Sequence, residues 1–265
     1  MEKDPYSRIA DAMVPWIDSI RSYPGFTEWK QRSIRHIMDY GEAVGFEEEP
    51  PPDPGFFFPP HLEKQHAAVM AFLSLGASYH AMAATQYYFR RYPFKDFPVS
   101  REDHLRYTCE AFFSRVYEFR ERLKRSLNAL DEVTPGTLNV GKMVNSFAKE
   151  FQHELKARNQ IHHHERFDEI QLNKVGLLEM MAKDDKRNGR DRMWDVETTI
   201  AYRAASREWS ERAKKRSDRA KVFLDAVSLA NLEYADWLKE PVVVDTVEAS
   251  GSGKPQLLSG PKPAD

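Results

Sequence analysis

The segment at residues 158–164, Arg-Asn-Gln-Ile-His-His-His, brings together the side chains of this chain that are best suited to catalysis. The arginine can hold a phosphate through two parallel hydrogen bonds, and the histidines can exchange a proton near neutral pH. RNA cleavage without a metal needs a base for the 2′-hydroxyl, a cation for the phosphate charge and an acid for the leaving oxygen. Arg158 and one or two histidines can fill these roles, particularly if a second subunit doubles the site.

The spacing of these residues indicates the end of a helix. Arg158 and His162 are four apart, so both can lie on one helical face. His163 lies about 140° from Arg158 around the axis. If the helix frays after Ile161, the three imidazoles become free to converge.

The elements that would position this segment are predicted to be helices, because apolar residues recur at spacings of three and four and strand-like alternation is scarce. Leu62–Arg91 forms one helix, and a capping box at Ser100 opens another that runs to about Leu130. A third helix runs over Val140–His163, and a final one over Asp195–Leu238 with one break. The segment between them is expected to be irregular from Phe167 to Leu178 and a charged loop from Lys183 to Arg192.

The predicted fold class is all-α, an up-and-down bundle of about four main helices with an N-terminal helical extension and a disordered C-terminal tail. The domain boundaries are 1–60 for the extension and its Pro-rich linker, 61–240 for the bundle and 241–265 for the tail. The extension is rich in aromatic residues, so we expect it to dock on the bundle. The triple Phe at 56–58 is expected to enter an apolar groove of this chain or of a partner.

Composition restricts the function. Hydrophobic residues make up 41% of the 265, charged residues 30%, and the net charge is −2, so any nucleic-acid site must be a local patch. The single cysteine, Cys109, excludes an intrachain disulfide and favours a reducing cytoplasm. The chain carries no P-loop, Rossmann or zinc-finger signature, and we expect no signal peptide, no membrane span and no cofactor.

The pattern at residues 158–164 resembles the HEPN superfamily (higher eukaryotes and prokaryotes nucleotide-binding). That family carries Arg, then four to six residues and then His, commonly with a polar residue such as Asn directly after the Arg, on a four-helix bundle. Arg158 and Asn159 match the start, and His163 and His164 both satisfy the spacing. The resemblance covers about residues 62–238.

This resemblance implies an RNA-binding protein or a metal-independent endoribonuclease, working as a homodimer in which both subunits contribute Arg and His. It also implies a toxin–antitoxin or defence setting. In this interpretation Arg158 holds the scissile phosphate, Asn159 orients the phosphate or the imidazole, and His163 or His164 is the acid and base.

A basic stretch supports an RNA partner. Residues 203–221 hold eight basic and three acidic side chains, a local charge of 8 − 3 = +5. Such a helix can follow a phosphate backbone or can be an ordinary solvated face. The candidate RNA-binding residues are Arg203, Arg207, Arg212, Lys214, Lys215 and Arg216.

Three alternatives stay open. The His cluster can be a solvated helix C-terminus, where basic residues are favoured by the helix dipole. Two Glu-x-x-His pairs, Glu63 with His66 and Glu150 with His153, keep a di-metal carboxylate bundle in view, although no metal site is assigned. The third is a non-catalytic helical interaction protein with a protein partner, which would use the triple Phe and the N-terminal aromatic residues.

Overall fold

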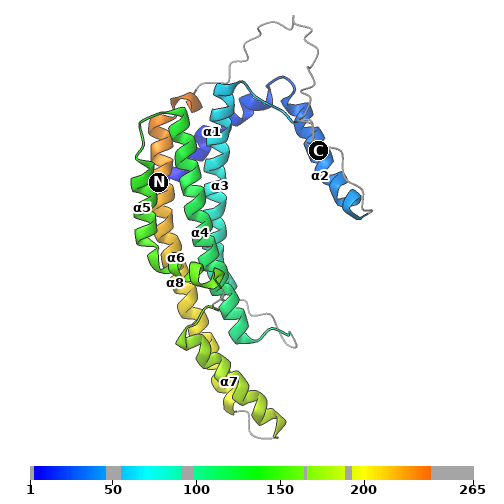
Figure 1. The fold of residues 1–265 in the computed structure, drawn as a ribbon, viewed down its shortest axis with the longest axis vertical. Coiled ribbons are helices and arrows are strands. Elements are labelled where there is room, and N and C mark those ends of the chain that lie inside the picture. Colours follow the sequence, from blue (N-terminus) through cyan, green and yellow to red (C-terminus); the bar gives the residue numbers. More distant parts are fainter. Residues whose placement is uncertain (1–2, 46–54, 91–97, 164–165, 189–192, 240–265) are drawn as a thin grey trace, which may run out of the picture.

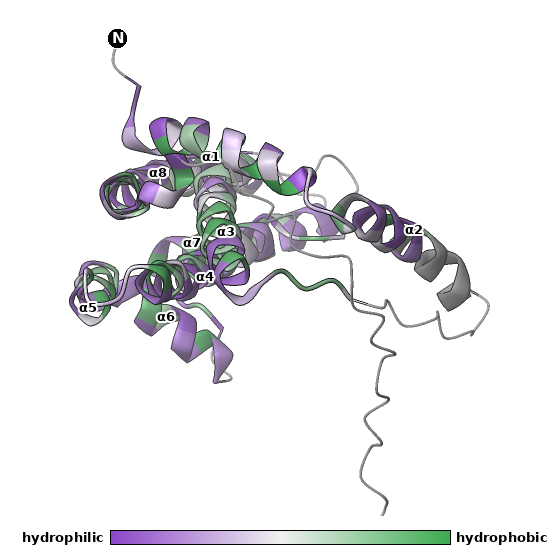
Figure 2. Ribbon diagram, turned by 90° about the horizontal axis from the view of Figure 1, so that it is seen from above, coloured by the Kyte–Doolittle hydropathy of each residue, from purple (hydrophilic) through white to green (hydrophobic). Residues whose placement is uncertain are grey.

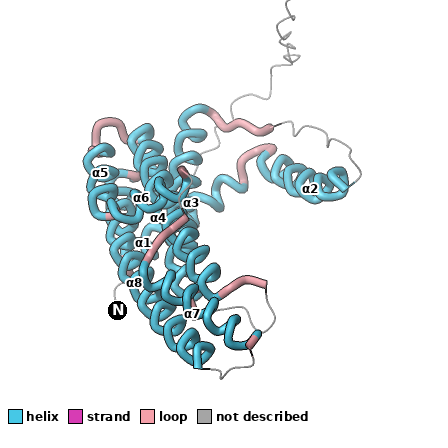
Figure 3. The backbone as a smooth tube through the Cα atoms, turned by 60° about the horizontal axis from the view of Figure 1, so that its bottom comes forward, coloured by secondary structure: helices cyan, strands magenta, loops and turns pink. Residues whose placement is uncertain are grey.

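The computed structural model describes residues 3–45, 55–90, 98–163, 166–188 and 193–239. Figure 3 shows only helices and loops in this part of the chain, which confirms the predicted all-α fold. The elements are α1 (Pro5–Arg21), α2 (Phe26–Gly45), α3 (Pro60–Tyr88), α4 (Arg101–Val133), α5 (Val140–Glu150), α6 (Gln152–His162), α7 (Ile170–Arg187), α8 (Met193–Tyr234) and a 3-10 helix η1 (Asp236–Lys239).

Helices α3, α4, α5 and α8 run alternately down and up along one long axis (Figure 1). α3 lies against both α4 and α8, and α4 also contacts α5 and α6. The predicted stripe on α4 is the centre of the core, with Phe112, Val116, Phe119 and Leu123 all 0% exposed. Spacings of three and four thus turn one face of α4 into a continuous buried surface.

Helix α4 begins where the sequence predicts. The Ser100 hydroxyl accepts from the backbone N–H of Asp103 at 2.9 Å and donates to the Asp103 carboxylate at 2.8 Å. These bonds satisfy a backbone N–H that would otherwise lack a partner in the first turn. The cap fixes the start of the helix that carries this buried stripe.

The expected docking of the N-terminal extension is confirmed for α1, which packs on α8 and η1. Ile9, Met13 and Trp16 of α1 are buried in the same core as the bundle residues. Helix α2 lies to one side when the bundle is viewed end-on (Figure 2). The predicted acidic Pro-rich linker falls mainly on residues 46–54, and the predicted disordered tail on residues 241–265; both lie outside the described residues.

The triple Phe enters an aromatic cluster of this chain in part. Phe58 is 8% exposed, and its ring lies 5.4 Å from those of both Tyr23 and Phe26. Phe56 joins the same cluster and is half-buried, whereas Phe57 is 83% exposed. The expected internal groove therefore holds two of the three rings.

Two expectations about helix boundaries were wrong, and a third was confirmed. The helix predicted over Val140–His163 is interrupted at Phe151, which separates α5 from α6. The segment expected to be irregular or a loop is helical from Ile170 to Arg187, because Leu172, Val175 and Leu178 are buried in α7, which packs on α8 and α4. The final helix has the one predicted break, which falls at Ala235 between the end of α8 at Tyr234 and the 3-10 helix η1.

Among the described residues, one helix, α3, is long and apolar enough to cross a membrane, judged by length and composition alone. Of its apolar window, 44% is buried inside the protein, and the helix lies between α4 and α8. Its small residues allow close packing, and Gly76 contacts the Tyr6 ring of α1 so closely that an added Cβ would overlap the hydroxyl. These contacts give α3 the position of a central bundle helix.

Candidate nucleic-acid site at the end of helix α6

Arg216 of α8 fixes the start of α6. Its Nη1 donates to Glu150 Oε1 at 3.1 Å, and its Nη2 donates to Glu154 Oε2 at 3.0 Å and to the Glu150 carbonyl oxygen. The guanidinium also lies over the Phe151 ring, 4.2 Å from the centroid. Glu154 is only 3% exposed, so Arg216 supplies the charge that its buried carboxylate requires.

The last turn of α6 carries the predicted catalytic residues. Arg158 is half-buried, with its guanidinium 4.0 Å from the centroid of the Tyr117 ring of α4. Its Nη1 also donates to Asn159 Oδ1 at 3.4 Å. Asn159, His162 and His163 are exposed, and the two imidazoles meet edge to face at 5.8 Å.

The helix ends within the motif. His163 is the C-cap residue, and its backbone N–H donates to the carbonyl oxygens of Asn159 and Gln160 at 3.1 Å. The structure therefore places Arg158, Asn159 and His163 in one exposed helix end. It also places them where the helix-dipole interpretation requires, since His162 lies in the last turn. His164, the second histidine that fits the motif, lies outside the described residues.

A cleft of about 330 Å³ lies along another face of α6. It is lined by His153, Lys156, Ala157, Gln160 and Ile161 of α6 and by Arg166, Phe167 and Asp168 of the following segment. At 100° per residue, the middle of this face is roughly 130° from Arg158. The sequence did not predict the cleft, and its only local signal is the mixture of basic, amide and aromatic side chains beside the motif.

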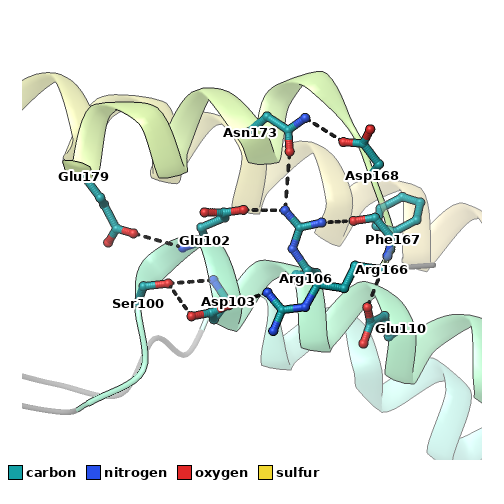
Figure 4. A network of polar contacts seen from close by, with 10 residues as sticks. All are labelled: Ser100, Glu102, Asp103, Arg106, Glu110, Arg166, Phe167, Asp168, Asn173 and Glu179. Atoms are coloured by element: carbon teal, nitrogen blue, oxygen red, sulfur yellow. Dashed lines mark hydrogen bonds and ion pairs between the residues drawn. The ribbon is translucent and has the colours of Figure 1, made fainter. Parts of the chain in front are cut away.

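A polar network holds one wall of the cleft (Figure 4). Arg106 of α4 is 7% exposed and donates to the Phe167 carbonyl oxygen, to Glu102 and, at 3.4 Å, to Asn173 Oδ1. The Phe167 N–H donates to Glu110 Oε1 at 3.3 Å. Phe167, in the segment between α6 and α7, is thus held to α4 through both its backbone N–H and its carbonyl oxygen.

The same network fixes α7 further along. Glu179 of α7 accepts from the backbone N–H groups of Arg101 and Glu102 at 2.9 and 3.4 Å. These donors belong to the first turn of α4, where a carboxylate is favoured by the helix dipole. Gly176 lies so close to the Glu102 carboxylate that an added Cβ would displace it.

The predicted basic patch divides into two sets. Arg203, Arg207, Lys214 and Lys215 are exposed. Arg216 is engaged by Glu150 and Glu154, as described above. The structure thus gives it a packing role, and we do not retain it as a phosphate contact.

Arg212, also in the predicted patch, connects α8 to the cleft. It lies 4.5 Å above the Trp209 ring, with Nη1 3.9 Å from Glu169 Oε1. Its Nη2 is 3.3 Å from His153 Nδ1, in the cleft wall. Burial raises the pKa of Glu169, and Arg212 partly offsets that effect.

The two Glu-x-x-His pairs have other partners. Glu63 accepts from the Phe58 N–H at 3.1 Å, and His66 stacks on Trp16. Glu150 receives Arg219 as well as Arg216. Across the described ranges, no three His, Cys, Asp or Glu side chains gather as a metal site would require.

Comparisons with protein-family models, with curated proteins and with solved structures found no match for this chain.

Proposed function

We propose that this chain binds RNA at the exposed end of α6 and cleaves it without a metal, as the HEPN-like motif implies. One observation carries the proposal. α6 is held at its start by a buried ion pair, while its C-terminal end carries Arg158, half-buried against Tyr117, and the exposed Asn159 and His163. A cation and a proton-transfer group at one fixed helix end can fill the roles of charge stabiliser, base and acid that phosphodiester cleavage needs.

In the proposed mechanism, Arg158 holds the scissile phosphate and stabilises the charge that develops on it. Tyr117 supports the guanidinium from behind, and Asn159 orients it through the contact at 3.4 Å. His163 takes the 2′-hydroxyl proton and returns a proton to the leaving oxygen. The attacking 2′-oxygen displaces the 5′-oxygen, which leaves a 2′,3′-cyclic phosphate on one product and a 5′-hydroxyl on the other.

The exposed basic residues of α8 would guide the strand toward this end. Arg203, Arg207, Lys214 and Lys215 supply charges that a polyanion can reach, and each phosphate contact lowers the affinity as salt rises. Arg212 and the cleft residue Lys156 extend this basic surface to α6. We also propose that the protein works in a reducing cytoplasm, as its single cysteine favours.

Cleavage of mixed RNA in EDTA tests the proposal. Wild-type protein should yield 2′,3′-cyclic phosphate ends, and Arg158→Ala and His163→Ala should each lose about 100-fold or more of the activity. His162→Ala is the matched control, because it removes a neighbouring exposed imidazole outside the motif spacing.

Circular dichroism should show unchanged helicity in all three variants, because the altered side chains are exposed or half-buried. Full activity in both motif variants would remove the assignment. Absence of RNA binding and cleavage in the wild type would favour the alternative, a non-catalytic interaction protein, for which the exposed Phe57 is the supporting observation.

A further inference from the structure

Large apolar side chains are concentrated on the α7–α8 hairpin, away from the candidate site. Seven of the 17 large apolar residues that are exposed in the described chain lie between residues 170 and 200: Ile170, Leu177, Met180, Met181, Met193, Val196 and Ile200. Figure 1 shows this hairpin extending past the end of α4. Such a concentration marks an interaction surface.

One face of α7 has the spacing of a helix-pairing seam. Positions 170, 174, 177, 181, 184 and 188 follow alternating steps of four and three, and all six residues are exposed: Ile170, Lys174, Leu177, Met181, Asp184 and Asn188. We call this set the α7 stripe. Steps of four and three keep a stripe facing one partner helix.

The opposite face of α7 is occupied within the chain. Leu172, Val175 and Leu178 are buried there, and Glu179 bonds to the first turn of α4. The α7 stripe is therefore presented outward by a helix that is fixed from behind.

The charges of the α7 stripe are self-complementary. If two copies of α7 run antiparallel about a two-fold axis at position 179, each residue faces the one whose number brings the sum to 358. Ile170 then meets Asn188 at the two ends, and between them Lys174 meets Asp184 of the second copy and Leu177 meets Met181. Two-fold symmetry repeats each contact, as an isologous interface requires.

We propose that the α7 stripe is the surface through which two copies of this chain form an antiparallel dimer. The pairing needs no other molecule, because cation and carboxylate, and Leu and Met, are matched within one sequence. From Ile170 to Asn188 the helix is about 27 Å long. The two α6 ends, which precede α7 in the chain, would lie toward opposite ends of the paired helices, so each copy would carry its own site, unlike the shared site that the HEPN resemblance implies.

Sedimentation equilibrium of the full chain and its charge variants tests this pairing. Lys174→Glu and Asp184→Lys should each raise the dimer dissociation constant by about tenfold or more, because each places two like-charge pairs in the interface. The double variant Lys174→Glu/Asp184→Lys restores opposite charges and should return within about threefold of wild type. Neither charge change opposes the dipole of α7, so the helix should persist.

Apolar variants complete the test. Leu177→Asp/Met181→Asp should give monomer, whereas Val222→Asp, at an exposed apolar position of α8 outside residues 170–200, should leave the dimer intact. A wild-type monomer at every concentration, a dimer indifferent to the α7 variants, or a double charge variant without rescue would each overturn the proposal. RNA cleavage is scored separately with the α6 variants, so failure of one proposal does not imply failure of the other.

Discussion

Arg216 shows how one residue can carry the placement of a whole site. Its guanidinium satisfies the buried Glu154, contacts Glu150 and covers Phe151. Its neighbour Arg219 reaches the same Glu150 at 3.2 Å, but its side chain is 59% exposed. Solvent screens Arg219 and leaves Arg216 as the essential partner.

We expect Arg216→Met to destabilise the fold by about 3 kcal/mol, because it leaves the Glu154 carboxylate buried without a counter-charge. Arg219→Met is the matched control and should cost less than about 1 kcal/mol. Urea unfolding followed by circular dichroism measures both. Equal costs for the two variants would refute the distinction drawn here.

At the scale of elements, the sequence predicts what local patterns encode. The stripe on α4 and its Ser100 cap are visible in the residues themselves. The break at Phe151 and the start of α7 each have a distant partner that no local spacing reveals. Arg216 of α8 donates to the Glu150 carbonyl oxygen, and Arg106 of α4 donates to Asn173.

The candidate site divides in the same way. Its position at a helix end could be predicted from the motif spacing. The cleft could not, because residues 153–161 and 166–168 meet only when the chain turns back after α6. The pairing of Arg216 with Glu154 could not be predicted for the same reason, since the two residues are 62 positions apart in the sequence.

Arg106→Met should release α7 and the cleft wall from α4. We expect the free energy of unfolding to fall by roughly 3 kcal/mol, because the variant removes a nearly buried cation from Glu102 and from two other acceptors. Amide hydrogen exchange should show faster exchange across residues 170–187 with little change in α3. Exchange that rises uniformly over the whole chain would contradict a local role for this network. Arg115→Met, which removes an exposed ion pair with Glu118 on the same helix, is the control.

At the scale of the whole molecule, two half-buried histidines make stability depend on pH. Burial lowers the pKa of His66, with Glu63 partly opposing, and burial lowers the pKa of His104. His66 packs between Trp16 of α1 and Phe58 of the aromatic cluster. His104 lies 3.2 Å from the Tyr202 hydroxyl of α8.

Because both pKa values are lower in the folded chain, the unfolded chain takes up protons first as the pH falls. The contribution to stability is fully present above the unfolded pKa of about 6.5 and is lost as the pH falls through the folded values. We expect the melting temperature to decrease between about pH 7 and pH 5. The double variant His66→Phe/His104→Gln should flatten this dependence relative to a variant at the exposed His61; an unchanged slope would exclude the two histidines as its source.

The only thiol in the chain lies at the centre of this core. Cys109 is 0% exposed, and burial raises its pKa well above the ordinary range, so the folded protein withholds both access and the reactive thiolate. An aromatic disulfide reagent can therefore modify it only during moments when α4 separates from its neighbours. The rate at which Cys109 is modified in native buffer would then report local opening of α4. The chain thus carries a natural probe of its own local unfolding and needs no engineered label.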